Sequence, residues 1–451
     1  MSNPATKKQE KIYVKAVNGK FRTIRWLFLW TLLGIYFLLP WIKVDGRQAL
    51  LFDIPARKFY VFGIIIWPQD IYILAFILIL LAIGLFFFTA IAGRLWCGYG
   101  CPQTVFTDLF LWIERIFEGD RQNQIKLDKS KWTLEKAAKK TWKHLAWITA
   151  SFLTAFTFVS YFVPPGILIE RTVSAALTNA NIFWLALFTI TTYWDCGGFR
   201  EQMCIYVCPY GRFQGAMFDP QTLVIAYDKS RGEPRDIFRR GVERKAGNCV
   251  DCSMCVQACP TGIDIRNGLQ IECIACAQCI DTCNSVMKKI GFSQGLIRYG
   301  AMASFEGQKI KVMRPRVIAY AVILFFMASG IVYDFAGRKT MAIDIIRSRT
   351  SLYNIMPDGR VSNVYTIKAM NMDTKEHTYK IIADGLNNAE IVMAGNPIFV
   401  KSGEVYTADV YLITDKKTLD TKIIRFNFIL QDIDNPMLMA KKQSTFFTAM
   451  N

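Results

Sequence analysis

Five stretches of the chain are dominated by apolar residues, as expected of helices that cross a bilayer, which need about 20 such residues. The fourth is short, because Asp195, Arg200 and Glu201 end its apolar character, so it either extends upstream through 175–181 or lies tilted against its neighbours. The pattern therefore predicts a polytopic α-helical membrane protein with about five spans. These are residues 26–42, 71–92, 145–163, 182–194 and 317–335.

From about Ala342 to Asn451 the pattern changes to short stretches in which apolar and polar residues alternate, separated by Gly, Asn, Asp and Pro. Alternation with period two is typical of β-strands that bury one face. We expect a small β-sandwich with a structural or docking role, because His377 stands alone there and the acidic residues are scattered. The clearest strands are expected at 364–369, 377–383, 405–413 and 421–430.

Composition agrees with a membrane protein and narrows its chemistry. The 451 residues are 52% hydrophobic and only 20% charged, which excludes a disordered or fibrous chain, and their number allows about three domains. With two histidines, His144 and His377, the chain lacks the paired axial imidazoles of a cytochrome b and the imidazole-rich zinc or copper sites. Membrane haem is thereby nearly excluded.

Charge predicts the orientation in the membrane. The chain has 54 Lys and Arg against 36 Asp and Glu, a formal net charge of +18. Residues 94–143 hold ten Lys or Arg, whereas 164–181 hold only Arg171, so the positive-inside rule places the first loop in the cytoplasm and the second outside. Alternation then places 195–316 in the cytoplasm and the β-rich segment outside. The basic segment before the first span lacks a cleavage site and is interpreted as a retained cytoplasmic tail. Its cations are Lys7, Lys8, Lys11, Lys15, Lys20, Arg22 and Arg25.

All thirteen cysteines lie between Cys97 and Cys283, on the reducing side of this topology, and the exported segment has none. Such clustering indicates metal binding. Eight of them form two runs with the same spacing: Cys249, Cys252, Cys255, Cys259 and Cys273, Cys276, Cys279, Cys283. Such a spacing binds a pair of [4Fe-4S] clusters, in which three thiolates of a run hold one cube and the fourth reaches the other cube. Cluster one is expected to take Cys249, Cys252, Cys255 and Cys283, and cluster two Cys273, Cys276, Cys279 and Cys259.

Pro260 after Cys259 fits this spacing, whereas Asn284 stands where a second proline is typical. The alternative is a pair of all-thiolate zinc sites, which the two matching runs disfavour. Iron-sulfur clusters pass one electron at a time, so the chain is interpreted as a conduit or a one-electron reductase.

A second cysteine pattern, Cys-x-x-x-Cys-Pro, occurs at the ends of the second and fourth apolar stretches. If the local backbone is helical, the two thiols of a pair lie on one face. Proline after the second Cys suits the first turn of a new helix, whose free N–H groups are expected to lower the pKa of that thiol. We expect these four soft ligands to form a copper site that favours Cu(I). They are Cys97, Cys101, Cys204 and Cys208.

Two alternatives remain open for these pairs. Buried Cys also packs as a small hydrophobic residue, and Cys-Pro also marks a helix restart. A disulfide between Cys97 and Cys101 is a minor option, because it would be strained or transient in the cytoplasm. The remaining cysteine, Cys196, is interpreted as a packed thiol.

Six further stretches have a distinctive sequence: 98–106, 199–204, 208–214, 227–228, 231–235 and 261–270. They resemble the FixG/RdxA/CcoG family of cytochrome oxidase accessory proteins, and the resemblance spans nearly the whole chain. The resemblance implies an inner-membrane protein with a cytoplasmic dicluster ferredoxin domain and an outer immunoglobulin-like domain. It further implies reduction of Cu(II) to Cu(I) in support of assembling a cbb3-type oxidase. Arg231, Glu233 and Arg235 match the family without a chemistry that we can derive, and we expect a charged loop that pairs with the membrane surface or the dicluster domain.

Three functions compete. The first is a membrane cupric reductase that supports copper delivery to the oxidase; the second is an electron-transfer subunit resembling NapH, which passes electrons between quinol and a partner redox protein; the third is a non-redox assembly scaffold. The exported β-domain favours the first. The chain has no Rossmann glycine fingerprint and no flavin site, so a separate molecule must donate electrons.

The expected partners are the cbb3 oxidase assembly machinery, copper chaperones or a copper transporter, membrane lipid and, as a further option, a second copy of the chain, but no nucleic acid. The expected domains are the tail 1–24, a membrane region 25–210, the ferredoxin domain 211–316, a last span 317–337 and an immunoglobulin-like domain 338–451.

Overall fold

The computed structural model describes residues 11–44, 46–238, 247–338, 340–348, 351–373, 375–386, 388–415 and 423–448. These residues divide into two compact units, each described by itself. Unit 1 covers Met1–Ile54 and Asp70–Ile331, and unit 2 covers Pro55–Gln69 and Val332–Asn451. The predicted residues Lys7 and Lys8 lie outside the described part of the chain.

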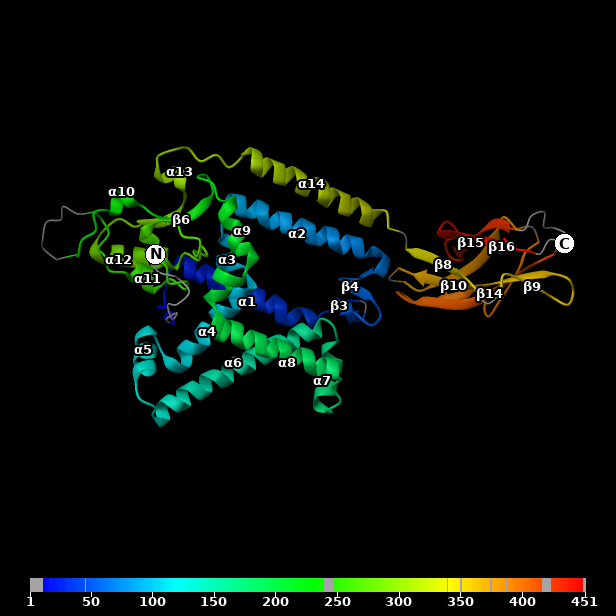
Figure 1. Cartoon of the computed structure of the whole chain (residues 1–451), viewed down its shortest axis with the longest axis horizontal. Helices are drawn as coiled ribbons and strands as arrows, with labels where there is room; N and C mark the ends of the chain where they lie inside the picture. The colour runs from blue at the N-terminus through cyan, green and yellow to red at the C-terminus, as the bar shows by residue number, and fades with distance from the viewer. Residues whose placement is uncertain are drawn as a thin grey trace, which may run out of the picture. The chain divides into compact units, whose positions relative to one another are not determined.

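Unit 1 is mainly helical (Figure 1). Helices occur at all five places where the apolar pattern predicts spans, namely α1, α2, α6, α8 and α14. The helices are α1 Lys20–Leu38, α2 Ile71–Ala92, α3 Leu95–Tyr99, α4 Pro102–Glu118, α5 Arg121–Lys129, α6 Leu134–Ser160, α7 Pro165–Val173, α8 Asn179–Trp194, α9 Pro209–Met217, α10 Lys229–Gly232, α11 Met254–Gln257, α12 Gln278–Ile290, α13 Met302–Phe305 and α14 Pro315–Ala336. Short 3-10 or π turns are η2 Leu39–Trp41, η4 Asp195–Phe199, η5 Met203–Val207 and η6 Ile265–Asn267.

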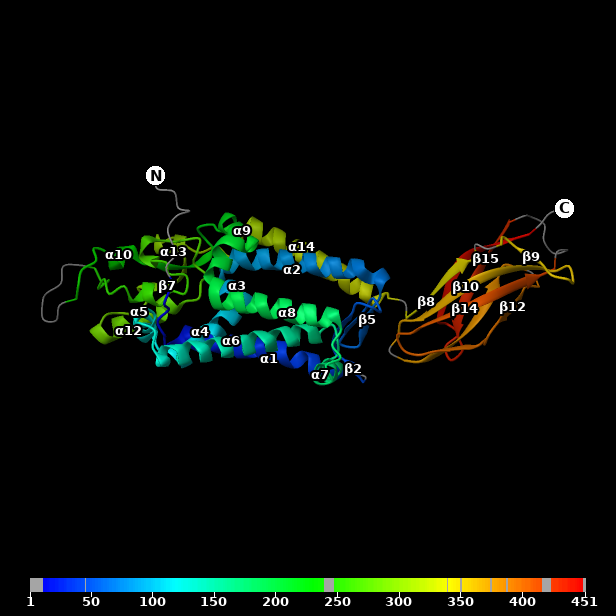
Figure 2. The ribbon, with the colours of Figure 1, turned by 60° about the horizontal axis from the view of Figure 1, so that its bottom comes forward.

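Three helical segments among the described residues are long and apolar enough to cross a membrane: Lys20–Trp41, Ile71–Ala92 and Pro315–Ala336. Helix α6 is long, but its first third is polar, and α8 has 16 residues, fewer than the roughly 20 needed to span a bilayer upright. Figure 2 shows α6 and α8 running alongside one another, with α2 beside α14. Three candidate membrane helices are thus identified by length and composition, and the other two spans stay a prediction.

The ferredoxin segment is closed by a pair of strands and contacts the start of α1. Strands β6 Leu223–Tyr227 and β7 Ile297–Ala301 pair antiparallel and enclose the cysteine runs. At the N-terminus of α1, the backbone N–H groups of Phe21 and Arg22 donate to the Asp281 carboxylate at 3.3 and 2.8 Å. Asp281 lies on α12 between Cys279 and Cys283, so a residue of the ferredoxin segment supplies hydrogen bonds that the start of α1 would otherwise lack.

The segment before α1 is not a free basic tail in its described part. The backbone N–H of Lys15 donates to Gln257 O at 2.8 Å, and the hydroxyl of Tyr13 donates to Asp128 at 2.8 Å. Arg22 and Arg25 are buried beside Asp108 of α4, at 2.6 and 3.4 Å. Sequence reasoning placed both arginines in a basic cytoplasmic tail, because it could not see that α4 supplies a buried counter-charge. A buried charge that loses its partner costs about 3–5 kcal/mol, so Asp108 holds α1 against α4.

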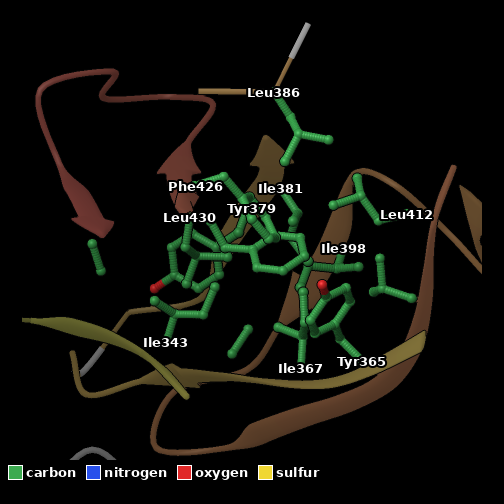
Figure 3. Packing of buried hydrophobic residues seen from close by; sticks show 14 of the residues in the cluster. Ile343, Tyr365, Ile367, Tyr379, Ile381, Leu386, Ile398, Leu412, Phe426 and Leu430 are labelled. Atoms are coloured by element: carbon green, nitrogen blue, oxygen red, sulfur yellow. The ribbon is translucent and has the colours of Figure 1, made fainter. Parts of the chain in front are cut away.

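Unit 2 is a β-sandwich, as the alternating pattern predicts. One antiparallel sheet has the order β12-β14-β10-β8, with β9 also on β10, and the other has the order β13-β11-β15-β16. Figure 3 shows Tyr365, Tyr379 and Phe426 filling the space between them. The strands are β8 Met341–Arg347, β9 Asn354–Ile355, β10 Val361–Asn371, β11 His377–Asp384, β12 Glu390–Met393, β13 Ile398–Val400, β14 Val405–Thr414, β15 Ile423–Asp432 and β16 Met439–Phe447. Strands β4 Lys58–Val61 and β5 Ile64–Ile66 form a hairpin in the same unit. Unit 1 also contains the short strands β1 Lys43–Val44, β2 Arg47–Gln48 and β3 Leu50–Asp53. A 3-10 turn, η3 Pro68–Asp70, precedes α2.

Candidate iron-sulfur and thiolate centres

The eight cysteines of the two runs line two cavities inside unit 1. One cavity is bordered by Cys249, Cys252, Cys255 and Cys283. A second cavity is bordered by Cys259, Cys273, Cys276 and Cys279, with Cys255 also reaching it. Cys259 and Cys283 thus line the cavity of the other run, which is the arrangement that the spacing predicts for crossed ligands.

The chemistry of the cavity walls fits an all-thiolate cluster. Beside the thiols, the second cavity is lined by Ile225, Ile263, Ile265 and Ile274, which exclude water. Burial raises the pKa of Cys273 and of Cys283 to about 12, so a bound metal must displace their protons. Among the described residues no three Cys, His, Asp or Glu converge on a single metal ion. A four-iron cube does not require such convergence, because each thiolate binds a different iron atom.

The two runs share their backbone as well as their spacing. Asp251 and Ser253, which flank Cys252, have φ values of 47° and 53°, and Ala275 and Ala277, which flank Cys276, have 53° and 59°. Residues other than glycine rarely adopt positive φ, and doing so costs free energy. The same uncommon conformation on both sides of the middle cysteine indicates one cluster-binding turn used twice.

The 231–235 stretch positions Cys249. The guanidinium of Arg231 donates to the carbonyl oxygens of Ser293 and Gln294, and the N–H of Cys249 donates to Gly232 O at 3.3 Å. Glu233 accepts a hydrogen bond from the Tyr227 hydroxyl, in the wall of the first cavity, at 3.2 Å. The stretch therefore packs on the ferredoxin segment, which is one of the two places expected for this charged loop.

The two Cys-x-x-x-Cys-Pro motifs meet in space. Arg94 donates to the carbonyl of Gly211, and Gln214 of α9 donates to the Cys97 thiol sulfur at 3.5 Å. The charges of Cys97, Cys101 and Cys208 all act on Cys204, so the four thiols lie within electrostatic range of one another. We call Cys97, Cys101, Cys204 and Cys208 the cysteine quartet.

Each motif has the same local form. Pro102 and Pro209 occupy the first turns of α4 and α9, as predicted, and the cysteine before each proline is the N-cap with extended backbone. The expectation of one continuous helical face is wrong, because α3 ends at Tyr99 and the second motif forms a π-turn over Met203–Val207. The two thiols of each pair are therefore brought together by a turn followed by a break, and not by one α-helix.

The expected lowering of the second thiol's pKa is also wrong for Cys101. The N–H groups of Gln103 and Thr104 do lower it, but burial has the larger opposing effect, so the pKa of Cys101 is raised overall. Burial likewise raises the pKa of Cys97 to about 11 and that of Cys204 to about 12. Without a metal, the raised pKa values of Cys97, Cys101 and Cys204 keep these three thiols in the neutral form at pH 7.

The first cysteine motif contacts the backbone of the loop that borders the second cluster cavity. Gly98 packs so tightly on the Cys273–Cys276 turn that an added Cβ would lie 2.8 Å from the carbonyl oxygens of Ile274 and Ala275. The Tyr299 hydroxyl donates to Ala275 O at 2.6 Å and lies 3.3 Å from the Tyr99 hydroxyl. Cys97 is therefore the chain neighbour of Gly98, the residue whose backbone contacts the ligand loop of cluster two.

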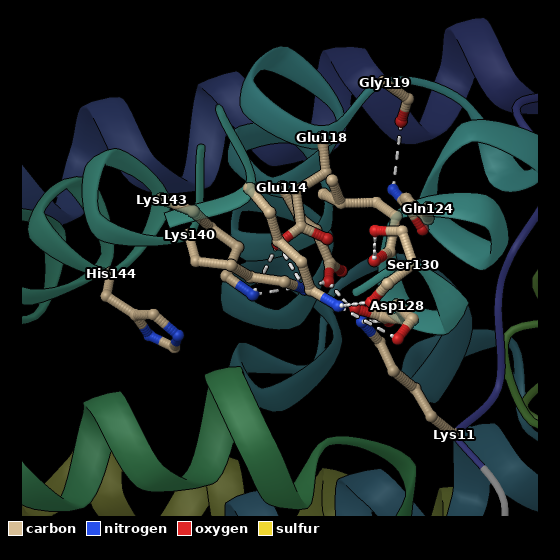
Figure 4. Close-up of polar contacts among 12 residues, drawn as sticks. Lys11, Glu114, Glu118, Gly119, Gln124, Asp128, Ser130, Lys140, Lys143 and His144 are labelled. Carbon is tan, nitrogen blue, oxygen red and sulfur yellow. Dashed lines mark hydrogen bonds and ion pairs between the residues drawn. The ribbon is translucent and has the colours of Figure 1, made fainter. Parts of the chain in front are cut away.

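Helix α4 also carries a buried ion-pair network that the sequence did not reveal (Figure 4). Glu114 pairs with Lys11 and Arg200 at 2.8 and 2.9 Å, and Glu118 pairs with Lys140 and Lys143 at 2.9 and 2.8 Å. Cys196 packs against Phe110, Ile113 and Trp147, which confirms its prediction as a packed thiol.

Comparison with known proteins defines the class of protein. A 4Fe-4S dicluster domain matches residues 199–302, a 4Fe-4S binding domain matches 74–118, and the IG-like fold at the C-terminus of FixG matches 331–449. With the cysteine-lined cavities and the three apolar helices, these matches define a membrane-associated iron-sulfur electron-transfer protein. Both Cys-x-x-x-Cys-Pro motifs lie inside segments matched by 4Fe-4S models.

The chain belongs to the FixG/RdxA family. It is 36% identical over 432 residues to nitrogen fixation protein FixG of Rhizobium meliloti, covering 87% of this chain and 82% of that protein. It is 39% identical over 401 residues to protein RdxA of Cereibacter sphaeroides, covering 85% and 84%. Ferredoxin-type protein NapH of Escherichia coli is 23% identical over 298 residues, covering 59% of this chain and 89% of NapH.

Proposed function

We propose that the protein is a membrane-bound cupric reductase that converts Cu(II) to Cu(I) in support of copper delivery to a cbb3-type oxidase. The observation that carries this proposal is the contact of Gly98, inside the first cysteine pair, with the ligand loop of cluster two. A soft thiolate site next to a one-electron cofactor is the arrangement that reducing and retaining copper requires.

The eight cysteines of the two runs and the cysteine quartet have separate roles. The eight cysteines of the two runs would hold two [4Fe-4S] clusters, which supply one electron at a time when bound. The quartet would bind the copper substrate with thiols that copper itself draws together, because no three of them converge on one metal position in the described residues. Cu(II) would accept one electron and become Cu(I), which soft sulfur ligands prefer. Arg94, which is 4% exposed and acts electrostatically on Cys97, Cys204 and Cys273, balances negative charge on both sides of the transfer.

We propose five spans in a bacterial inner membrane, with the ferredoxin segment in the cytoplasm and the β-sandwich in the periplasm. Exposed apolar side chains on α6 and α8 support the two additional spans: Ile148, Phe152 and Leu153 on α6, and Phe183, Trp184 and Ile190 on α8. The β-sandwich would then meet the partners expected there, the oxidase assembly machinery and copper chaperones or a transporter. A second copy of the chain is a further candidate partner.

The test uses purified full-length protein reduced with dithionite, then mixed with chelated Cu(II) while a Cu(I)-specific chelator reports the product. We expect a Cys101→Ala, Cys208→Ala double variant to lose Cu(I) binding and most of the rate. Its iron should stay at about eight atoms per chain, the content of two cubes. Cys196→Ala is the matched control, because that thiol lies in a separate hydrophobic cluster.

Iron analysis also separates copper from a third cluster in the quartet. About twelve iron atoms in the parent, falling to about eight in the double variant, would show that the quartet holds a cube and would contradict the copper assignment. Unchanged copper binding and an unchanged rate in the double variant would return the quartet to a packing role.

A second candidate is an electron-transfer subunit similar to NapH, which the alignment over 89% of that protein favours. The C-terminal match at 331–449 favours the reductase. A protein that reduces a partner redox protein but leaves Cu(II) unreduced would select the second candidate.

A further inference from the structure

A cavity between the middle of α6 and the C-terminal end of α8 has no part in the proposed copper chemistry. It has a volume of about 470 Å³, within the range for small-molecule sites. Its walls combine the aromatic side chains of Trp147, Tyr193 and Trp194 with the polar side chains of His144, Arg200 and Glu201.

The aromatic walls are held in place. Trp147 is buried, stacks on Phe110 with ring centroids 5.7 Å apart, and donates its indole N–H to Phe110 O at 3.1 Å. Trp194 stacks on Phe199 at 4.9 Å with the ring planes 14° apart. Such fixed aromatic surfaces suit a planar ring.

The polar groups suit a ring that carries hydroxyls. Tyr193 Oη lies 2.8 Å from His144 Nδ1, which leaves Nε2 of that imidazole for a ligand. Figure 4 shows the imidazole lying apart from the ion pairs of the neighbouring lysines. The amide oxygen of Gln202, also in the wall, has no hydrogen-bond partner within the described residues.

The cations of the wall do not favour an anionic headgroup. Lys11 and Arg200 pair with Glu114, and Lys143 pairs with Glu118. Because each positive charge already has a buried carboxylate partner, the cavity offers no unpaired cation to a phosphate. A neutral ligand is the better match.

The cavity continues into an apolar groove. A second cavity of about 690 Å³ shares Lys143 and His144 with the first and is lined by Trp132, Leu145 and Ile148. Leu145 and Ile148 are exposed and belong to the apolar part of α6. Head cavity and groove together fit a molecule with a polar ring and a long apolar tail.

On its other side the head cavity approaches the redox centres. A further cavity shares Ile12, Arg200 and Glu201 with it and is also lined by Cys204 and Ile274. The Arg200–Glu201 segment is thus a wall between the head cavity and a space bordered by the quartet and the cluster-two loop.

We infer that this cavity binds a lipid quinol, which is the electron donor of the protein. This inference rests on the proposed reductase function. One quinol becomes one quinone and gives up two electrons and two protons. When bound, the clusters would serve as one-electron carriers, so that one quinol would reduce two Cu(II) ions, and His144 and Glu201, the two bases in the wall, would accept the protons.

The experiment uses full-length protein in detergent micelles without copper. Mixing with menadiol, a soluble quinol, should bleach the visible absorbance of the clusters, and the quinol-site inhibitor 2-heptyl-4-hydroxyquinoline N-oxide should block the bleaching. His144→Gln and Tyr193→Phe should each slow it about tenfold, as the loss of one hydrogen bond of about 1.4 kcal/mol would. Lys139→Gln, at an exposed position of α6 paired with Glu135, is the control and should match the parent.

Dithionite separates this inference from the proposed function. It should reduce the clusters of every variant, and the reduced variants should convert Cu(II) at the parent rate. Clusters of the parent that accept electrons from dithionite but not from menadiol would overturn the quinol site, as would parent rates of bleaching in both variants. Failure of the dithionite-reduced parent to reduce Cu(II) would overturn the reductase function and leave cluster reduction by menadiol to decide the quinol site.

Discussion

Cys259 and Cys283 connect the two cluster cavities, because each stands in one cysteine run and lines the cavity of the other. Their neighbours Cys255 and Cys279 lie within the same hydrophobic cluster. A single residue change at either connecting position should therefore act at a distance along the chain.

We predict that Cys283→Ser damages the cluster held by Cys249, Cys252 and Cys255, and that Cys259→Ser damages the other. Serine oxygen is a poorer ligand for iron than thiolate, so each variant should lose up to about four of its eight iron atoms. Electron paramagnetic resonance of the reduced protein measures which signal disappears. Cys196→Ser should keep both signals. Loss of the same signal in both variants would rule out the crossed arrangement.

The candidate ligands were predictable from sequence because iron-sulfur chemistry dictates both residue type and spacing. Arg22, Arg25 and Asp108 show the opposite case. An arginine near the chain start is indistinguishable in sequence from a surface cation until a carboxylate 80 or more positions later is placed beside it. The positive φ values around Cys252 and Cys276 were equally hidden, because Asp, Ser and Ala do not announce that conformation as glycine does.

At the scale of elements, the contact of α3 with the Cys273–Cys276 turn joins the quartet to the ferredoxin segment. The contact requires a residue without a side chain at position 98, since an added Cβ would lie closer to two carbonyl oxygens than real Cβ atoms do. α3 therefore sets the distance between the two redox centres.

We predict that Gly98→Ala slows the reduction of Cu(II) by dithionite-reduced protein by about tenfold or more, because a shift of reacting groups by about 1 Å can cost 100-fold. Iron content should not change, since position 98 binds no metal. Stopped-flow mixing with chelated Cu(II) measures the rate. Gly34→Ala in α1, where an added Cβ meets nothing within 4 Å, is the matched control. Equal rates for Gly98→Ala and the parent would separate this contact from electron transfer.

Most elements followed from hydrophobic periodicity. The second apolar stretch and α2 have the same bounds. The four predicted strands lie within β10, β11, β14 and β15, except that residues 421 and 422 of the fourth lie outside the described part of the chain. The π-turn of the second cysteine motif was not predictable, because no residue type selects it. Strands β8, β12, β13 and β16 were missed, since each is short or mixes both polarities.

For the whole molecule, the proposed five-span topology places the thirteen cysteines and the β-sandwich on opposite sides of a membrane. Alkaline phosphatase fused after Ala440 should be active and a fluorescent protein fused there should not mature, because only the periplasm supports the first and only the cytoplasm the second. Fusions after Gly307 should behave in the opposite way. A cytoplasmic result at Ala440 would overturn the five-span topology, and the short α8 would be the helix that fails to cross.

The bond between Asp281 and the start of α1 has a consequence for how the protein is made. Ribosomes synthesise α1 first, and the N–H groups of its first turn have no Asp281 carboxylate to bind until about 260 more residues have been made. Asp281 stands between two cluster ligands on α12, so it reaches its place only once that stretch has folded. The first helix to be inserted is therefore among the last to be fastened, and biogenesis of the membrane part is tied to maturation of the cofactor-binding part.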